Sequence, residues 1–214
     1  IVMDTTPPDT SITSQPLNLT NSTSANFSFT STEDGSTFEC QIDSGSYTTC
    51  TSPKEYTGLA EGSHTFNVRA IDTTNNTDQT PASYTWTIDT ILPTVSSISP
   101  EDVATGVALS TSKTIITATF SEVMDKSTIT TSTFTLSDGT NTVTGTVTYS
   151  STTATFTLSS NLTSGTTYTA TITTDVKDTA GNKMASDKKW SCTTLGNLTW
   201  DAPTTNVDGT PVGL

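Results

Sequence analysis

Short runs in which apolar residues alternate with Thr, Ser and other polar residues recur along the whole sequence. Successive side chains of a β-strand point to opposite faces, so each run predicts a strand with one buried face. The runs end at Gly, Pro, Asn or Asp, which are typical of turns, and no stretch has helical spacing. The pattern predicts an all-β fold of antiparallel β-sandwiches. The expected inward residues are Ala25, Phe27, Phe29, Phe38, Cys40, Ile42, Phe66, Val68, Ala70, Tyr84, Trp86 and Ile88 in the first half, and Ile116, Ala118, Phe120, Phe134, Leu136, Val143, Val147, Tyr149, Phe156, Leu158, Tyr168, Ala170, Ile172, Trp190 and Cys192 in the second.

Ser and Thr make up roughly two residues in five, a proportion also found in disordered, glycosylated stalks. Their alternation with Phe, Val, Ile and Tyr favours strands instead, because the β-branched side chain of Thr fits a pleated surface. A turn at Asp138-Gly139 predicts a hairpin in the second half.

Two short segments recur about one small domain apart. Asp4–Pro8 is repeated as Asp89–Pro93, and Asp72–Asn76 is repeated as Asp178–Asn182. Repeats of this kind indicate tandem modules, and about one hundred residues suffice for each module to bury a core. We therefore expect a linker at residues 1–9, one sandwich at 10–89, a second at 90–195, and a truncated module or tail at 196–214.

Several segments of the sequence are similar to known families. With Ser36–Cys40, Tyr56–Phe66 and Val68–Asp72, the first half resembles a bacterial immunoglobulin-like repeat. With Pro93, Phe120–Asp125, Gly165–Tyr168 and Asp178–Asn182, the second half is similar to the immunoglobulin-like domain of surface-layer and other bacterial surface proteins. With Leu198–Pro203 and Asp208–Pro211, the end of the chain resembles the opening strand of a fibronectin type III module. Together the resemblances imply tandem immunoglobulin-like sandwiches, and they imply architecture rather than an activity.

The three cysteines carry different expectations. Cys40 and Cys50 flank Gly45 symmetrically, so a hairpin there would set them face to face and allow a disulfide. A disulfide indicates an oxidising compartment, whereas the alternative is two buried thiols. Cys192 alternates with Trp190, and we expect it to be a buried thiol.

Charge limits the partners that this sequence can bind. The net charge is −13 with only 8 Lys and Arg residues, whereas phosphate binding needs clusters of basic residues. We therefore expect no nucleic acid, and no membrane insertion because no apolar run is long enough to span a bilayer. The ends of the sequence are typical of boundaries within a longer protein, so we expect any targeting or anchoring signal outside these residues.

No pattern of residues predicts catalysis. His64 is the only histidine and stands on an expected strand beside Phe66, without a Ser or Cys nucleophile in a recognisable context. Neither a zinc motif nor a Gly-rich phosphate loop is present. Glu122 and Asp125 are interpreted as residues at the end of a strand rather than as a site. We expect no enzyme activity and no cofactor other than calcium.

The repeated aspartates are the one arrangement that predicts chemistry. If each sandwich runs up and down, the loop before its last strand returns to the end where the chain enters. Asp178 and Asn182 would then lie near Asp89, with Glu61 approaching from the first module, and Asp72 would lie near Asp4 at an equivalent site. Clustered oxygen ligands of this kind suit calcium. The alternative is that Asp72 and Asp178 only form Asx turns with a left-handed Asn or Gly.

Two functions stay open. The first is a structural spacer and interaction module of a larger secreted or cell-surface protein, in contact with neighbouring modules of its own chain. The second is a module that binds a glycan or a protein, in an adhesin or in an accessory region of a secreted hydrolase. A sugar platform needs an exposed aromatic ring, and Tyr47 and Tyr56 are the candidates that the expected core leaves over.

Overall fold

The computed structural model describes residues 4–108 and 115–196, and in these residues the fold is all-β, as the sequence predicts. The expected fibronectin-like segments, Leu198–Pro203 and Asp208–Pro211, lie outside the described residues. Among the described residues, no helix has the length and apolar character that a membrane crossing requires. The helical element that is present, η1 (Lys126–Thr128), has three residues.

Contacts divide the chain into two compact units. The first unit contains Ile1–Thr94 together with two later segments, Glu122–Asp125 and Thr174–Ala185. The second contains Val95–Ser121, Lys126–Thr173 and Ser186–Leu214. The boundary at residues 89 and 90 stays a prediction, although strands β1 to β8 precede it and β9 to β16 follow it.

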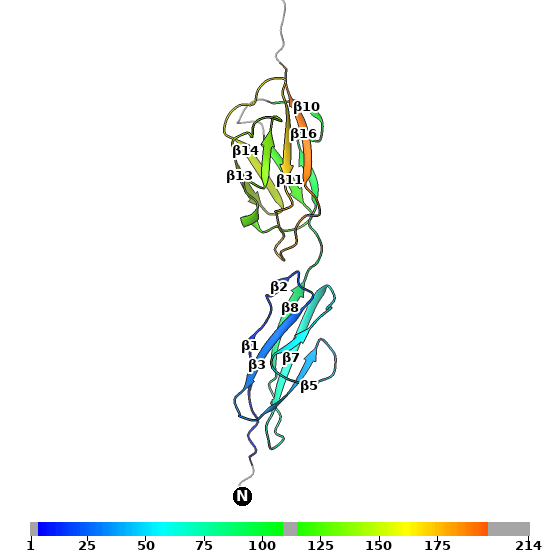
Figure 1. Cartoon of the computed structure of the whole chain (residues 1–214), viewed down its shortest axis with the longest axis vertical. Helices are drawn as coiled ribbons and strands as arrows, with labels where there is room; N and C mark the ends of the chain where they lie inside the picture. The colour runs from blue at the N-terminus through cyan, green and yellow to red at the C-terminus, as the bar shows by residue number, and fades with distance from the viewer. Residues whose placement is uncertain (1–3, 109–114, 197–214) are drawn as a thin grey trace, which may run out of the picture. The chain divides into compact units, whose positions relative to one another are not determined.

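The first sandwich has a three-stranded and a five-stranded sheet (Figure 1). The smaller sheet has the order β1-β3-β6, with β1 at Thr10–Ser14, β3 at Ala25–Ser31 and β6 at Lys54–Tyr56. The larger has the order β2-β8-β7-β4-β5, with β2 at Leu19–Thr20, β8 at Ala82–Ile88, β7 at Gly62–Ile71, β4 at Thr37–Ile42 and β5 at Thr48–Cys50. Strand β2 pairs with β8 in parallel, so the opening segment contributes to both sheets. Strands β3 and β4 are consecutive but belong to different sheets, so neighbours in the sequence are not always neighbours in a sheet.

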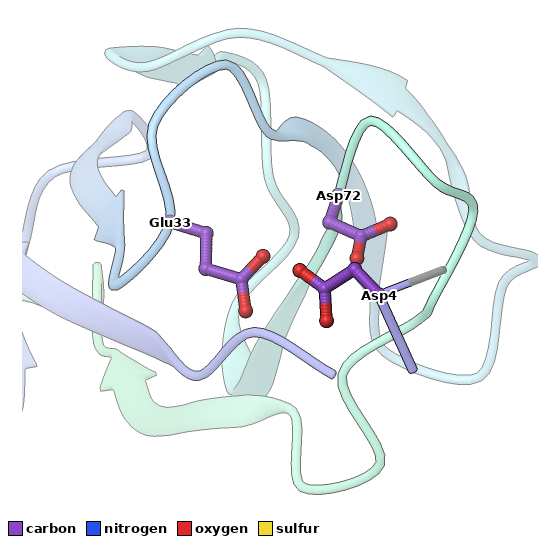
Figure 2. A group of neighbouring side chains, drawn as sticks. All are labelled: Asp4, Glu33 and Asp72. Carbon is purple, nitrogen blue, oxygen red and sulfur yellow. The ribbon is translucent and has the colours of Figure 1, made fainter. Parts of the chain in front are cut away.

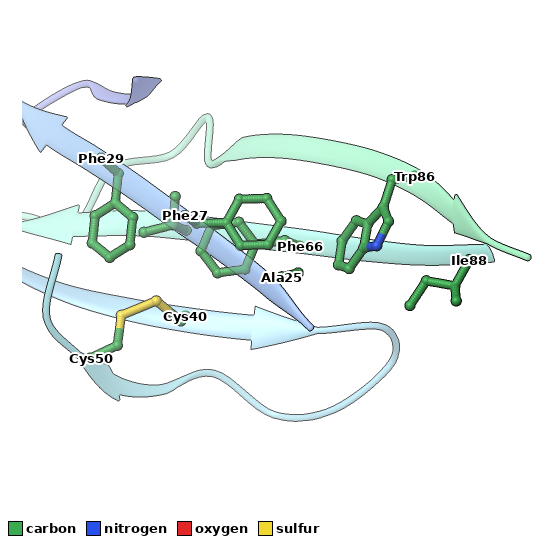
Figure 3. Close-up of a cluster of buried hydrophobic side chains, with 9 residues drawn as sticks. Ala25, Phe27, Phe29, Cys40, Cys50, Phe66, Trp86 and Ile88 are labelled. Atoms are coloured by element: carbon green, nitrogen blue, oxygen red, sulfur yellow. A yellow bond between two sulfur atoms is a disulfide. The ribbon is translucent and has the colours of Figure 1, made fainter. Parts of the chain in front are cut away.

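Aromatic rings fill the space between these two sheets (Figure 3). Phe27 of β3 stacks on Phe66 of β7 with ring centroids 4.1 Å apart, and Trp86 of β8 lies 5.2 Å from Phe27. Phe27, Phe66 and Trp86 are almost completely buried. Because burial of each ring removes a large apolar surface from water, this cluster stabilises the sandwich.

A disulfide joins Cys40 to Cys50, as one of the two readings of the sequence predicted. The two cysteines are not directly opposite, because the register places Cys50 beside Phe38 and Cys40 beside Thr48. The bond therefore runs diagonally across β4 and β5 on the buried face, where side chains two positions apart are within reach.

The second sandwich has two four-stranded sheets. One has the order β10-β16-β15-β12, with β10 at Ala104–Val107, β16 at Lys188–Thr194, β15 at Thr167–Ile172 and β12 at Phe134–Ser137. The other has the order β13-β14-β11-β9, with β13 at Gly145–Ser150, β14 at Thr153–Leu158, β11 at Ile115–Phe120 and β9 at Val95–Ser99. Phe134 and Phe156 meet between the sheets with centroids 5.7 Å apart, and Cys192 is a buried free thiol.

The hairpin turn predicted at Asp138-Gly139 is present, but the two strands that flank it do not continue as a pair. A tight turn is present, since the backbone N–H of Asp138 donates to the carbonyl of Asn141 and Gly139 has a φ of 93°. The strands on either side, β12 and β13, nevertheless belong to different sheets. Pairing across the turn is short: Ser137 bridges Thr142, and the N–H of Val143 donates to the carbonyl of Leu136 at 2.8 Å. After Val143 the chain crosses to the other layer.

Candidate metal centres

The loop between β7 and β8 is organised by one buried carboxylate. Asp72 is 7% exposed, and its Oδ1 accepts hydrogen bonds from the backbone N–H groups of Thr74 (2.8 Å) and Asn76 (2.7 Å). Its Oδ2 accepts from the Thr74 hydroxyl at 2.9 Å and from Nδ2 of Asn76 at 2.7 Å. Four donors thus surround the carboxylate, which is about the number that its lone pairs can accept.

The loop between β15 and β16 repeats this arrangement. Asp178 is 1% exposed, and its Oδ1 accepts from the N–H groups of Ala180, Gly181 and Asn182 at 2.7–2.8 Å. Its Oδ2 accepts from Nδ2 of Asn182 at 2.7 Å. In both loops the residue before the Asn has a left-handed backbone, with φ of 68° at Asn75 and 104° at Gly181. The Asx-turn reading of both aspartates is therefore correct as a description of the loops.

Each loop also binds the segment that carries the other repeated aspartate. Nδ2 of Asn76 donates to the carbonyl of Asp4 at 3.1 Å, and Nδ2 of Asn182 donates to the carbonyl of Asp89 at 2.8 Å. The two early aspartates fold alike, since Oδ1 of each accepts from the N–H two residues later, at Thr6 and Ile91. The juxtapositions expected from the sequence, Asp72 with Asp4 and Asp178 with Asp89, are both present.

A third carboxylate joins each pair. Glu33, two residues after β3 ends, brings a carboxylate oxygen within 4.8 Å of oxygens of Asp4 and Asp72, and in Figure 2 the carboxylates of Glu33 and Asp4 lie beside that of Asp72. Glu122, two residues after β11 ends, does the same for Asp89 and Asp178. We call these the Asp4 group (Asp4, Glu33, Asp72) and the Asp89 group (Asp89, Glu122, Asp178). All six residues belong to the first compact unit.

Two expected ligands have other contacts. Glu61 is absent from the Asp89 group, and its Oε2 accepts from the hydroxyl of Thr90 at 2.7 Å. Asn182 directs its amide nitrogen, not its oxygen, toward Asp178 and the Asp89 carbonyl. Its role in the loop is therefore to position these groups.

The electrostatics of the Asp4 group reflect three acidic side chains close together. Burial, followed by the negative charges of Asp4 and Asp72, raises the pKa of Glu33 above its ordinary value. Burial also acts to raise the pKa of Asp72, but the hydrogen bonds from Asn76 and Thr74 outweigh it and hold that pKa below its ordinary value. Like charges disfavour the ionised form. A cation between these oxygens would remove the repulsion on Glu33.

Hard oxygen ligands from carboxylates and backbone carbonyls are those that calcium prefers. Each group offers three carboxylates, and a carbonyl lies beside it at Asp4 or Asp89. No Cys or His belongs to either group, so the donor set fits a hard cation rather than zinc.

The family profile described as a bacterial Ig-like domain matches residues 89–194. This segment is a bacterial Ig-like domain. Its match begins at Asp89, the residue that the Asn182 amide binds. No match to the chain was found among curated proteins.

Several solved structures are similar to parts of the chain. The N-terminal part of the bacterial S-layer protein SbsC is 24% identical over 49% of the chain, with a TM-score of 0.37, and the chain covers 24% of its length. In rSbsC(31-844) the chain covers 14% of the length. The fibronectin(III)-like modules of Clostridium thermocellum CbhA are 15% identical over 91% of the chain and 98% of theirs, with a TM-score of 0.40.

A cationic side chain lies over the ring of each tyrosine proposed as a sugar platform. Tyr56 makes a T-shaped contact with Phe66 at 5.9 Å, and Nζ of Lys54 lies 5.2 Å from the centroid of its ring. The guanidinium of Arg69 lies over the ring of Tyr47 at 4.2 Å, and Arg69 also pairs with Glu39 at 2.7 Å.

The sequence pattern did not identify Glu33 or Glu122 as members of a group. One signal was available, because both are acidic and both stand two residues after the second long strand of their sandwich. An acidic residue after a strand is common, so this signal identifies a site only when the fold is known. The fold places the loops that carry Glu33 and Glu122 beside the loops that carry Asp72 and Asp178.

Proposed function

We propose that this chain is a tandem array of Ig-like modules that acts as a structural spacer in a secreted or cell-surface bacterial protein, without a catalytic centre of its own. The observation that carries the proposal is the duplicated arrangement of Asp, Glu and Asx loop in the Asp4 and Asp89 groups. Because the arrangement is repeated at the start of successive modules, we infer that it organises the connection between modules rather than the binding of one ligand. The bacterial Ig-like domain at residues 89–194 supports the surface location.

We further propose calcium as the ion that both groups bind. In each group the buried Asp is already held by four donors, so the less buried pair, Asp4 with Glu33 or Asp89 with Glu122, would supply most of the charge. Binding would offset the repulsion among three carboxylates in a protein of net charge −13. The ion would tie the segment at Asp89 to the loop at Asp178 and so limit flexing along the array.

Calorimetric titration of the metal-free protein with calcium tests the ion. Glu33→Gln and Glu122→Gln each remove one carboxylate and leave the Asx loops intact, whereas replacement of Asp72 or Asp178 would break the loop itself. We expect each variant to lose the heat of one site and the double variant to lose both. Asp34→Asn is the matched control, because it makes the same charge change beside Glu33 at an exposed residue. Absence of heat at millimolar calcium, or an unchanged isotherm in the double variant, would contradict the calcium proposal.

A domain replacement tests the spacer role separately. In the full-length protein, this stretch would be exchanged for unrelated tandem sandwiches of similar length. Retention of surface display and of any adhesion supports a spacer. Loss of binding to one glycan or protein partner, with display intact, would instead support the binding-module function.

A further inference from the structure

We propose that His64 is a pH-sensitive latch that holds the loop at residues 57–61 to the sandwich. His64 lies in β7, is 8% exposed, and directs both ring nitrogens at oxygen atoms. Nδ1 is 3.0 Å from Oδ2 of Asp43, and Nε2 is 2.8 Å from the carbonyl oxygen of Ala60. Neutral imidazole has one N–H, so both contacts are hydrogen bonds only when the ring is protonated.

Asp43 is fixed in place for this contact. Its Oδ1 accepts from the N–H of Thr65 at 2.9 Å, and its own N–H donates to the carbonyl of Thr65 at 2.7 Å. The carboxylate therefore cannot turn away from His64 without breaking bonds to β7. A rigid acceptor of this kind favours the imidazolium.

Within residues 4–108 and 115–196, the other elements that contact the ring place no second charge against it. On β8 the neighbour is Trp86, whose ring centroid is 5.5 Å from that of His64. On the loop side the contact is the Ala60 carbonyl, and the adjacent Glu61 carboxylate is bound to Thr90. Asp43, from the turn after β4, is thus the charged group that faces the ring. The Ala60 carbonyl raises the pKa of His64, burial lowers it, and Asp43 raises it again, with a net increase above the ordinary value.

Loss of the proton would break the contact with the loop. The remaining N–H belongs on Nδ1, because a hydrogen bond to a carboxylate is stronger than one to a neutral carbonyl. The lone pair of Nε2 then faces the lone pairs of the Ala60 oxygen at 2.8 Å, and the loop has to move away. Two further bonds connect this loop to the rest of the unit, from Leu59 N–H to the Thr23 carbonyl and from the Thr90 hydroxyl to Glu61. Deprotonation therefore loosens residues 57–61 and, through Glu61, the chain at Thr90.

The direction of the effect follows from the raised pKa. The stabilising contribution is complete below the pKa of an unfolded histidine, about 6.5, and is lost as the pH rises through the folded-state pKa of His64. The latch is closed in mildly acidic surroundings and opens as they become alkaline.

NMR titration tests the latch directly, because His64 is the only histidine and gives one Cε1–H signal. We expect its midpoint to lie above that of a free histidine, and the amides of Ala60, Glu61 and Thr90 to shift with the same midpoint. Their hydrogen exchange should become faster above it. Asp43→Asn should lower the midpoint, and His64→Gln should abolish the inflection of the loop amides while the core signals stay in place.

Three results would overturn the proposal. They are a midpoint at or below that of free histidine, loop amides without an inflection at the His64 midpoint, and an inflection that persists in His64→Gln. If His64→Gln fails to fold, Asp43→Asn alone decides the question. In Asp43→Asn the titration midpoints of the His64 ring and of the loop amides must decrease by the same amount. A shift of one midpoint without the other contradicts the latch.

Discussion

Asn182 donates its side-chain amide to the carboxylate of Asp178 at 2.7 Å, and both residues are buried. The same Nδ2 donates to the carbonyl of Asp89, so the Asn182 side chain connects the loop between β15 and β16 to a residue 93 positions earlier. We expect Asn182→Ala to reduce the free energy of unfolding by about 1–3 kcal/mol, because it leaves a buried carboxylate with an unsatisfied oxygen. Urea denaturation measures the change. Asn141→Ala, at an exposed turn, is the control and should change stability by less than about 0.5 kcal/mol. Equal effects of the two substitutions would refute the structural role of Asn182.

Gly145 leaves no room for a side chain. A Cβ placed there would lie 2.6 Å from Cζ of the buried Phe156 and 2.6 Å from the carbonyl oxygen of Thr157. Gly145→Ala should therefore destabilise the second sandwich by about 1–3 kcal/mol through overpacking. Gly196→Ala, where no atom of the described residues lies within 4 Å of the added Cβ, should be nearly neutral in the same thermal melts. A stable Gly145→Ala variant with an unmoved Phe156 ring would show that the contact is absent.

The disulfide between Cys40 and Cys50 closes a short loop in the first sandwich. Restriction of the unfolded chain by a loop of this size is worth about 2–3 kcal/mol. Thiol titration in denaturant should find one free thiol, from Cys192, and three would contradict the bond. The double substitution Cys40→Ala and Cys50→Ala should lower the melting temperature of the first sandwich, as should reduction. The transition of the second sandwich should stay in place in both experiments.

Asp78 links the loop after β7 to the first strand. It is 2% exposed, and its carboxylate accepts from the N–H groups of Thr10 (3.0 Å) and Thr80 (2.7 Å). Burial acts to raise its pKa, but the hydrogen bond of the Thr10 hydroxyl, the two from the N–H groups and that of the Thr80 hydroxyl together outweigh burial and lower it. Its contribution to stability is therefore present above the pKa of an unfolded Asp, about 3.9, and is lost as the pH falls through the lower folded-state value.

Asp78→Asn tests this dependence. At neutral pH the variant should be less stable than the native protein, because an NH₂ donor replaces one of the two carboxylate oxygens that accept hydrogen bonds. The difference should shrink as the solution is acidified below about pH 3.9. Asp34→Asn, at an exposed position, should follow the native curve throughout. A difference that stays constant with pH would mean that ionisation of Asp78 contributes nothing.

The strands and the core were predictable from the sequence because a period of two leaves a strong local signal. Phe27, Phe66 and Trp86 were expected inside and are buried there. The passage of the chain between layers was not predictable, since the turn at Asp138-Gly139 has the same chemistry whether the next strand pairs locally or crosses. Val147 and Tyr149, expected in the core, are only half-buried because β13 is an edge strand.

The candidate site was predictable in part for a related reason. The repeats revealed both pairs of aspartates, since duplication is visible in the sequence. The place of Glu33 two residues after a strand is a weak local signal, and only the order of the strands shows that Glu33 lies beside Asp4 and Asp72. The orientation of the Asn182 amide depends on the donors and acceptors around it, which the composition of the loop does not reveal.

The Asp89 group also affects where the chain can be divided. Asp89 stands before the first strand of the second sandwich, yet its carbonyl and carboxylate lie with Asn182 and Asp178. A fragment that begins at residue 90 would retain every strand of that sandwich but would lose Asp89, whose carbonyl accepts from Asn182. A fragment that begins a few residues earlier keeps this hydrogen bond. For recombination between such proteins, the unit that can be exchanged intact therefore begins at the aspartate, upstream of the first strand.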